Sequence, residues 1–188
     1  MKTIQVALFF VFLNAYAFAQ TKRDYPLFEI FGGYSLLDSD HKGLSSSRQY
    51  SSGWEASVSA NVNQYFGVEV SVAGYYKTYG LADFLNAAVA DYSYLVGPRV
   101  RYGPIFVHGL FGGDSLSASS SEFSESQTGF SGAFGGGVQA PITDRYSFYA
   151  GADYVFSRHD FFSPPMTENN FRISLGIVIK LSGKKTTP

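Results

Sequence analysis

Apolar and polar residues alternate along several stretches of the chain. Between Gly53 and Val62, every second residue is apolar, and the residues between them are Gly, Glu, Ser or Asn. The same pattern runs from Phe66 to Lys77 and again from Phe171 to Leu181. Because successive side chains of a strand point to opposite faces, this period of two predicts β-strands with one apolar and one polar face.

Five further segments follow the pattern less regularly, so that eight strands are expected in all. They are Leu27–Leu36, Tyr92–Tyr102, Ile105–Asp114, Phe130–Ala140 and Tyr146–Phe156. Pro98 falls inside one of them, where it would mark either a bulge or a locally relaxed ladder, because proline has no N–H to donate.

The expected connections alternate between short and long. The short ones are Asn63–Gln64, Gly103–Pro104 and Pro141–Arg145, and the long ones are Asp38–Ser52, Tyr79–Ala90, Ser115–Gly129 and Arg158–Asn169. This alternation is typical of outer-membrane barrels, in which the short turns face the periplasm and the long loops face outward. The pattern therefore predicts an all-β fold, an eight-stranded antiparallel up-and-down transmembrane β-barrel, with the Ser-rich run from Ser115 to Ser126 as an external loop tip.

The first residues have the form of a secretory signal. Lys2 precedes an apolar run from Ile4 to Phe12, and Ala17-Phe18-Ala19 provides the small residues that signal peptidase accepts. The alternative, a membrane anchor, would need about 20 apolar residues. We expect a cleaved signal peptide over residues 1–19, a barrel domain over residues 20–182 and a short tail over residues 183–188. Since the rest of the chain has no 18-residue apolar run, it could cross a membrane only as a closed barrel.

Composition narrows the class of protein. Only 15% of residues are charged, against about 25% in soluble domains, whereas Gly (20), Tyr (14) and Phe (18) are abundant. The absence of Cys excludes disulfides, cysteine metal sites and thiol catalysis, and the net charge of −1 provides no basic surface for nucleic acid.

The two faces of the strands differ in side-chain size. The polar face is mostly Gly, Ser and Ala, which suits the narrow interior of an eight-stranded barrel. Gly135-Gly136-Gly137 would relieve crowding there or permit strand curvature. The apolar face carries aromatic residues toward the strand ends, as in the two belts at membrane interfaces. These residues are Phe28, Tyr34, Trp54, Phe66, Tyr76, Tyr94, Tyr102, Phe130, Phe148, Tyr154 and Phe171. The alternative is a soluble barrel whose aromatic face points inward.

Charged residues on the polar face form a predicted network inside the barrel. Its members are Glu29, Glu55, Glu69, Arg99, Arg101, Asp153 and Arg172. Glu69 lies at a depth similar to that of Arg99 and Arg101, and Asp153 at a depth similar to that of Arg172. Because buried charges need partners, and acids and bases nearly balance, the network favours a plugged lumen over an ion-selective conduit.

No catalytic or cofactor site is expected. His41, His108 and His159 lack metal-ligand spacing, and His108 fits a hydrogen-bonded residue of the lumen. Ser157, His159 and Asp160 invite comparison with a nucleophile set, but adjacent His and Asp do not give triad geometry. The outer-membrane lipid A deacylases carry Ser and His on a late strand facing the lipid, and the order and spacing of Ser157 and His159 differ from theirs.

Several loose motifs, in this order, carry a family resemblance. They are Phe31-Gly32-Gly33-Tyr34-Ser35, Gly97-Pro98-Arg99, Gly135-Gly136-Gly137-Val138, Asp153-Tyr154 and Phe171-Arg172-Ile173-Ser174-Leu175-Gly176. With them the chain resembles the small OmpA-like outer-membrane β-barrel family. The resemblance implies location in the outer membrane of a Gram-negative bacterium. It also implies contact with outer-membrane lipid, folding by periplasmic chaperones and the barrel assembly machinery, and roles in adhesion, surface recognition, envelope integrity or weak channel activity.

We therefore expect a non-enzymatic outer-membrane barrel that contacts an extracellular ligand through its long loops. The alternatives are a narrow pore for small solutes or ions and, with less support from the motifs, a lipid-modifying enzyme. The last expected strand ends at Leu181, before the end of the chain, which departs from the terminal aromatic residue that barrel assembly signals usually have.

Overall fold

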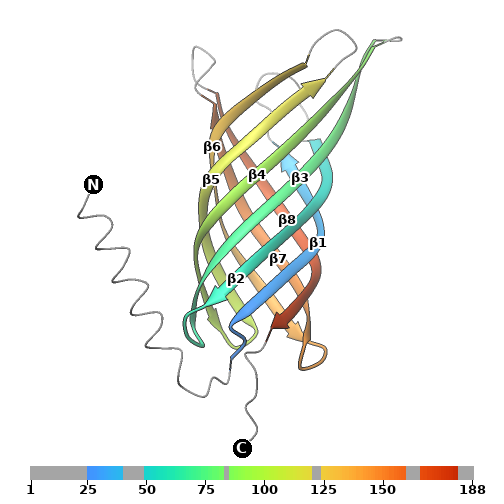
Figure 1. Ribbon diagram of the computed structural model, residues 1–188. Helices are drawn as coiled ribbons and strands as arrows, with labels where there is room; N and C mark the ends of the chain where they lie inside the picture. The colour runs from blue at the N-terminus through green and yellow to red at the C-terminus, as the bar shows by residue number, and fades with distance from the viewer. Residues whose placement is uncertain (1–24, 40–48, 83–84, 120–123, 160–165, 182–188) are drawn as a thin grey trace, which may run out of the picture.

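The computed structural model describes residues 25–39, 49–82, 85–119, 124–159 and 166–181. They form eight strands: β1 (Phe28–Ser39), β2 (Gln49–Asn61), β3 (Phe66–Ala82), β4 (Leu85–Tyr102), β5 (Ile105–Ser119), β6 (Ser124–Pro141), β7 (Tyr146–His159) and β8 (Met166–Leu181). Each strand pairs antiparallel with its neighbours in sequence, and β1 pairs with β8 to close the barrel (Figure 1). The expected eight-stranded antiparallel barrel is confirmed.

The strands are strongly staggered. Following paired residues once around the closed sheet leads from Val107 to Ser117 in β5, a stagger of 117 − 107 = 10 residues. A staggered sheet closes only if its strands tilt, which Figure 1 shows as diagonal ribbons. Eight strands enclose an interior that side chains can fill, so the contents of the lumen determine what the barrel can do.

The apolar face of the wall points outward. In β2, Trp54 and Val58 are 40% and 45% exposed, whereas Glu55 and Ser59 are each 1% exposed. The other strands alternate in the same way, with Val, Ile, Leu, Phe and Tyr outside. A soluble barrel would bury these residues and expose the polar ones, so the alternative of a soluble, inward-facing aromatic core is wrong.

The three short turns lie at the same end of the barrel as the first residue of β1 and the last of β8 (Figure 1). Between β2 and β3, the Asn63 side-chain oxygen accepts hydrogen bonds from the backbone N–H groups of Tyr65 and Phe66, both at 2.8 Å. Thr143 makes the corresponding contacts between β6 and β7. Gly103, between β4 and β5, has φ of 59°, a value that glycine adopts without steric cost.

The expected long connections are too long, and this part of the prediction is wrong. β3 extends to Ala82 and β4 begins at Leu85, so most of the expected connection Tyr79–Ala90 is paired strand. Likewise, β5 extends to Ser119 and β6 begins at Ser124, so most of the Ser-rich run is ladder and not a loop tip. Backbone pairing needs no apolar face, so the ladders continue after the hydrophobic alternation has ended.

The other two long connections are shortened in the same way, because β1, β2, β7 and β8 all extend beyond their expected ends. The remaining segments 40–48, 83–84, 120–123 and 160–165 lie outside the described residues, as do the expected signal peptide, residues 1–19, and the tail, residues 183–188.

Pro98 interrupts pairing without shifting the register. Val96 pairs with Phe111 and Arg99 pairs with His108, so the same number of residues separates the partners on both strands. Between these pairs the β4–β5 ladder has a gap, because Pro98 has no N–H to donate. Of the two sequence-based interpretations, the relaxed ladder is therefore right and the bulge is wrong.

Candidate functional site in the barrel lumen

Arg172 of β8 lies at the centre of the lumen, where it is 1% exposed. Its Nη2 is 2.6 Å from Asp153 Oδ2 and 3.3 Å from Glu55 Oε1, and its Nε donates to Asp153 Oδ2 at 2.8 Å. The hydroxyl groups of Ser71 and Ser174 donate to Glu55 at 2.9 and 2.5 Å. One guanidinium thus joins carboxylates from β2 and β7, and hydroxyl groups satisfy the oxygens of Glu55.

His108 of β5 connects two parts of the network. Its Nδ1 is 3.2 Å from Glu69 Oε2, and its Nε2 is 2.8 Å from Asp153 Oδ1. An ionised carboxylate can only accept a hydrogen bond. Both contacts are therefore satisfied when the imidazole carries two protons, or when one of the carboxyl groups carries the second proton. In either case the charges of the three acids, the two arginines Arg99 and Arg172, and His108 sum to zero.

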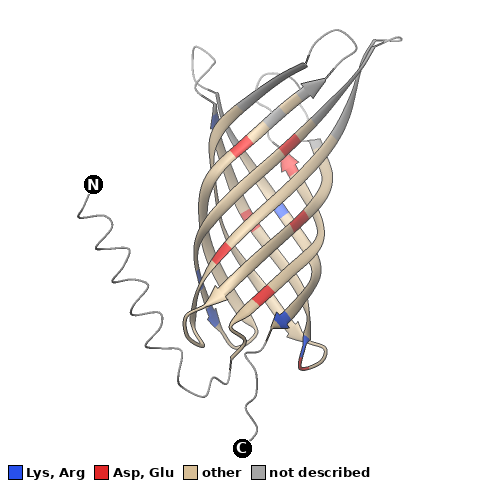
Figure 2. Ribbon diagram, viewed as in Figure 1, with Lys and Arg blue, Asp and Glu red and all other residues tan. Residues whose placement is uncertain are grey.

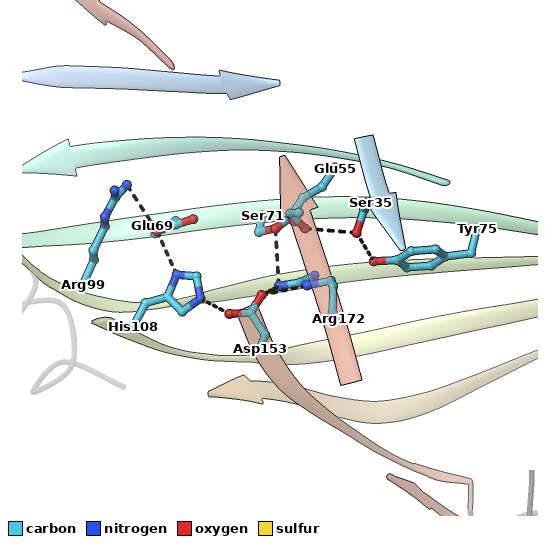
Figure 3. Close-up of polar contacts among 10 residues, drawn as sticks. Ser35, Glu55, Glu69, Ser71, Tyr75, Arg99, His108, Asp153 and Arg172 are labelled. Atoms are coloured by element: carbon cyan, nitrogen blue, oxygen red, sulfur yellow. Dashed lines mark hydrogen bonds and ion pairs between the residues drawn. The ribbon is translucent and has the colours of Figure 1, made fainter. Parts of the chain in front are cut away.

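Figure 3 shows the polar contacts as one continuous series across the lumen. At one end, Arg99 lies 3.5 Å from Glu69 and donates to the Ser59 hydroxyl at 2.7 Å. At the other end, the Ser35 hydroxyl lies 3.0 Å from that of Ser174 and 2.9 Å from that of Tyr75. The series therefore links most of the strands of the barrel through side chains alone.

Two apolar layers enclose this series of polar contacts, which we call the polar layer. On the side of the long connections, buried side chains pack around the end of the series: Leu37, Ala73, Tyr75, Leu95, Leu110, Ala133 and Val155. On the side of the short turns, Phe31, Phe106, Tyr149 and Val178 form a second cluster. The charges therefore lie between apolar groups, a setting in which an unpaired charge would be costly.

Aromatic stacking fills the cluster near the short turns. The ring of Tyr149 lies 4.0 Å from that of Phe31 and 5.0 Å from that of Phe106, measured between centroids. The guanidinium of Arg99 lies 4.3 Å from the Phe106 centroid, so this cation also contacts a ring face. A Cβ at Gly176 would clash with the backbone oxygen of Gly32 and would lie 2.7 Å from the Phe31 ring, so glycine here lets both the β1 backbone and this inward ring approach closely.

A separate ion pair lies at the short-turn end. Arg101 Nη1 donates to Glu29 Oε1 at 2.7 Å, joining β4 to β1 across the interior. The structure thus places Asp153 beside Arg172, and Glu69 beside Arg99, as the sequence analysis expected. It places Arg101 with Glu29 and not with Glu69. Figure 2 shows charged segments distributed along the barrel wall.

Sequence reasoning missed two features of the lumen. The first is His108 as the link between Glu69 and Asp153, although its inward direction was expected. The second is the set of large inward rings, Phe106 and Tyr149 among them. The signal was present, because Phe106 is two residues from His108 and therefore shares its face. Because Gly, Ser and Ala dominate the inward face, large rings were not expected on it.

The residues of the expected aromatic belts all lie on the outer surface. Their exposed fractions range from 40% for Trp54 to 77% for Tyr102. Some contact each other there: the Tyr76 hydroxyl lies 3.4 Å from Trp54 Nε1 and 3.2 Å from the Tyr92 hydroxyl. Rings on this surface leave polar atoms at the periphery, as an interface with a polar headgroup region requires.

The candidate nucleophile set is not assembled on the outer surface. Ser157 is 4% exposed and faces the lumen, whereas the deacylases carry their Ser toward the lipid. The side chains of His159 and Asp160 lie outside the description. Among the described residues, no group of His, Cys, Asp and Glu could hold a metal ion. Within the same ranges, no helix is long and apolar enough to span a membrane.

Comparisons with known proteins agree with this architecture. The family model for the outer membrane protein beta-barrel domain matches residues 6–178. Among solved structures, Ail, the attachment invasion locus protein of Yersinia pestis, is similar with a TM-score of 0.60 and 22% identity, covering 82% of this chain and 99% of that chain. No curated protein matches the chain.

Two more solved structures share the fold. Neisserial surface protein A has a TM-score of 0.60 and 14% identity, and the match covers 82% of this chain and 97% of that chain. OprG from Pseudomonas aeruginosa has a TM-score of 0.51 and 11% identity, with 86% and 98% covered. At these sequence identities, the similarity to the three solved structures shows a shared fold alone.

Proposed function

Because the chain belongs to the outer membrane protein β-barrel family, we propose that it is a non-enzymatic surface protein with a closed lumen. Its apolar outer face contacts the lipid, residues 1–19 are removed during export, and residues 20–182 form the barrel with a short tail over residues 183–188. Periplasmic chaperones and the barrel assembly machinery insert it. Its extracellular hairpins, and not its interior, contact the partner.

The observation that carries the proposal of a closed lumen is the position of Arg172. This side chain is buried at the centre of the barrel, between Glu55 on one side and Asp153 on the other. Leu110 and Tyr149, in the apolar layers on either side, are 0% and 1% exposed. An ion would have to displace the paired guanidinium of Arg172 and pass the two apolar layers, and both requirements oppose conduction.

The extended ladders support the proposed surface role. β3 and β4 pair as far as Ala82 and Leu85, and β5 and β6 as far as Ser119 and Ser124. Backbone pairing makes these hairpins stiffer than free loops, so they can present a binding surface with a low entropic cost. The names of the similar structures, an attachment protein and a surface protein, are compatible with such a role and identify no ligand for this chain.

Heat-modifiable gel mobility of outer-membrane fractions, combined with protease treatment of intact cells, tests the architecture and the location. We expect the unboiled protein to migrate differently from the boiled protein. We also expect protease to cut only between β1 and β2, β3 and β4, β5 and β6, or β7 and β8. Cleavage at the short turns in intact cells would show that the orientation is reversed.

Planar-bilayer recording tests the closed lumen against the alternative of a narrow pore. We expect the refolded protein to give no stable conductance steps. Variant Arg172→Ala together with Leu110→Ala removes one side chain from the polar layer and one from an apolar layer, and it should conduct more often than the natural chain. Stable, large steps from the natural protein would instead support the channel.

Shortening a hairpin tests the surface role. Removing the last paired residues of β5 and β6 should abolish attachment of protein-bearing cells to a test surface and leave gel mobility unchanged. A matched control changes Thr143 in the short turn to Ser, which keeps the side-chain hydroxyl. Attachment that survives shortening of every hairpin would contradict the proposal.

A further inference from the structure

A cleft of about 600 Å³ opens at the short-turn end of the barrel. Its charged and amide-bearing lining residues are Gln64 from the turn between β2 and β3, Arg101 from β4, Gln139 from β6 and Lys180 from β8. Pockets for small ligands have volumes of about 300–1,000 Å³, so the cleft has the size of a binding site and exceeds the needs of a single water molecule. In the orientation proposed above it faces the periplasm, away from the hairpins.

Gln139 points to a ligand. Its side chain is 4% exposed, and neither its Oε1 nor its Nε2 has a hydrogen-bond partner among the described residues. Its backbone N–H donates to Pro104 O at 2.7 Å, which fixes its position at the edge of the cleft. Buried polar groups are rarely left without partners. A primary amide offers one acceptor and two donors, which match the N–H and C=O of another amide.

The charged groups of the cleft favour an anion. Arg101 is 17% exposed and uses Nη1 to bind Glu29, and its remaining N–H groups are free to donate. Lys180 lies opposite Glu29 in the β1–β8 ladder and is half-buried, with no ion pair in the described part of the chain. The two cations and one carboxylate sum to a charge of +1 at this mouth, which attracts negative groups.

The walls of the cleft are largely apolar. Tyr25, Tyr65 and Pro104 line it beside the polar groups. The Tyr25 hydroxyl donates to Val62 O at 2.8 Å, and the Tyr65 ring lies 6.5 Å from that of Tyr102. The hydrogen bond restrains the Tyr25 side chain at the cleft before a ligand arrives, which lowers the entropic cost of contacts with it.

We infer that this cleft binds a small periplasmic ligand that carries a carboxylate next to an amide, as the free end of a peptide does. Lys180 and Arg101 bind the carboxylate, Gln139 pairs with the amide, and the tyrosine and proline side chains contact the rest of the ligand. The site is separate from the proposed surface role, since it lies at the opposite end of a closed lumen.

Titration of the refolded full chain in lipid nanodiscs tests this site. The probe is N-acetylglycine, which has the amide and the carboxylate, and the reporter is the NMR signal of the Gln139 side-chain amide, assigned by its loss in Gln139→Leu. We expect a saturable shift with N-acetylglycine and weaker binding of both acetate, which lacks the amide, and N-acetylglycinamide, which lacks the carboxylate.

Two variants distinguish binding in the cleft from nonspecific attraction of anions to this end of the barrel. Lys180→Met should weaken binding about tenfold, the change expected for one charge-assisted hydrogen bond. Arg145→Met removes a cation from the exposed turn between β6 and β7 at the same end and should leave the affinity unchanged. Gel mobility of each variant establishes that it has folded.

Three results would overturn the inference. One is the absence of a saturable shift at Gln139, and another is equal weakening by Lys180→Met and Arg145→Met. The third is equal affinity for acetate and N-acetylglycine, which would remove the role of Gln139. Each of these results would leave the conductance and attachment experiments unaffected, so failure of this inference is distinguishable from failure of the proposed function.

Discussion

The polar layer of the lumen and the apolar layers around it close the same barrel by different means. In the polar layer, Arg172, Asp153 and His108 hold one another through directed contacts from separate strands. In the apolar layers, Leu110 and Val178 fill space, and their contacts have no fixed partner atom. The polar layer therefore depends on each partner, whereas the apolar layers depend on total volume.

The largest effect is expected from breaking the polar layer at its centre. Arg172→Ala leaves Glu55 and Asp153 without their cation, and removal of one partner of a buried pair costs about 3–5 kcal/mol. The free energy of unfolding in urea, measured in detergent micelles, should fall by that amount. The control Arg172→Met with Glu55→Gln and Asp153→Asn removes all three charges and should recover most of the loss. Natural stability in Arg172→Ala would refute the description of the layer as an interdependent unit.

A smaller loss is expected from the apolar layer. Leu110 is 0% exposed, and Leu→Ala at such positions costs about 2–5 kcal/mol because a cavity remains. Leu110→Met keeps most of the volume and should cost less than about 1.5 kcal/mol in the same unfolding experiment. Equal losses in the two variants would mean that shape, and not volume, governs this layer.

Removing the His108 link between Glu69 and Asp153 should lower the free energy of unfolding by less than Arg172→Ala or Leu110→Ala does. His108→Leu removes two hydrogen bonds, but Arg99 and Arg172 still contact the two carboxylates. We expect a loss of about 1–3 kcal/mol. A double-mutant cycle with Glu69→Gln should give a coupling energy of about 0.5–3 kcal/mol, as is found for residues in one network. Additive losses would show that His108 acts independently of Glu69.

The smallest effect is expected outside the barrel. Val58 is 45% exposed on the outer face, where lipid tails can replace the contacts of the two deleted methyl groups. Val58→Ala should change the free energy of unfolding by about 0.5 kcal/mol or less. A loss as large as that of Leu110→Ala would place this side chain in a protein contact and not against lipid.

The sequence predicted the wall better than the contents of the lumen. Alternation around Glu55 and Glu69 identified the inward face, because a period of two depends only on the backbone. The ends of the strands were missed, since paired backbone beyond the apolar band leaves no hydrophobic signal. The contact of Arg101 with Glu29 was missed as well. It joins strands that are not neighbours, and the stagger that brings them together arises from pairing around the whole sheet.

The pairing of β1 with β8 has a consequence for how the chain folds. Phe28 pairs with Leu181, so this ladder joins the most distant parts of the barrel in sequence, and contacts of such long range form slowly. Ser174 and Arg172, both in β8, provide partners for Glu55 in β2. Until the last strand docks, Glu55 can find neither. The contacts of Arg172 and Ser174 with Glu55 therefore form only when β1 and β8 close the barrel, and before closure Glu55 has only Ser71 of the neighbouring strand β3 as a partner.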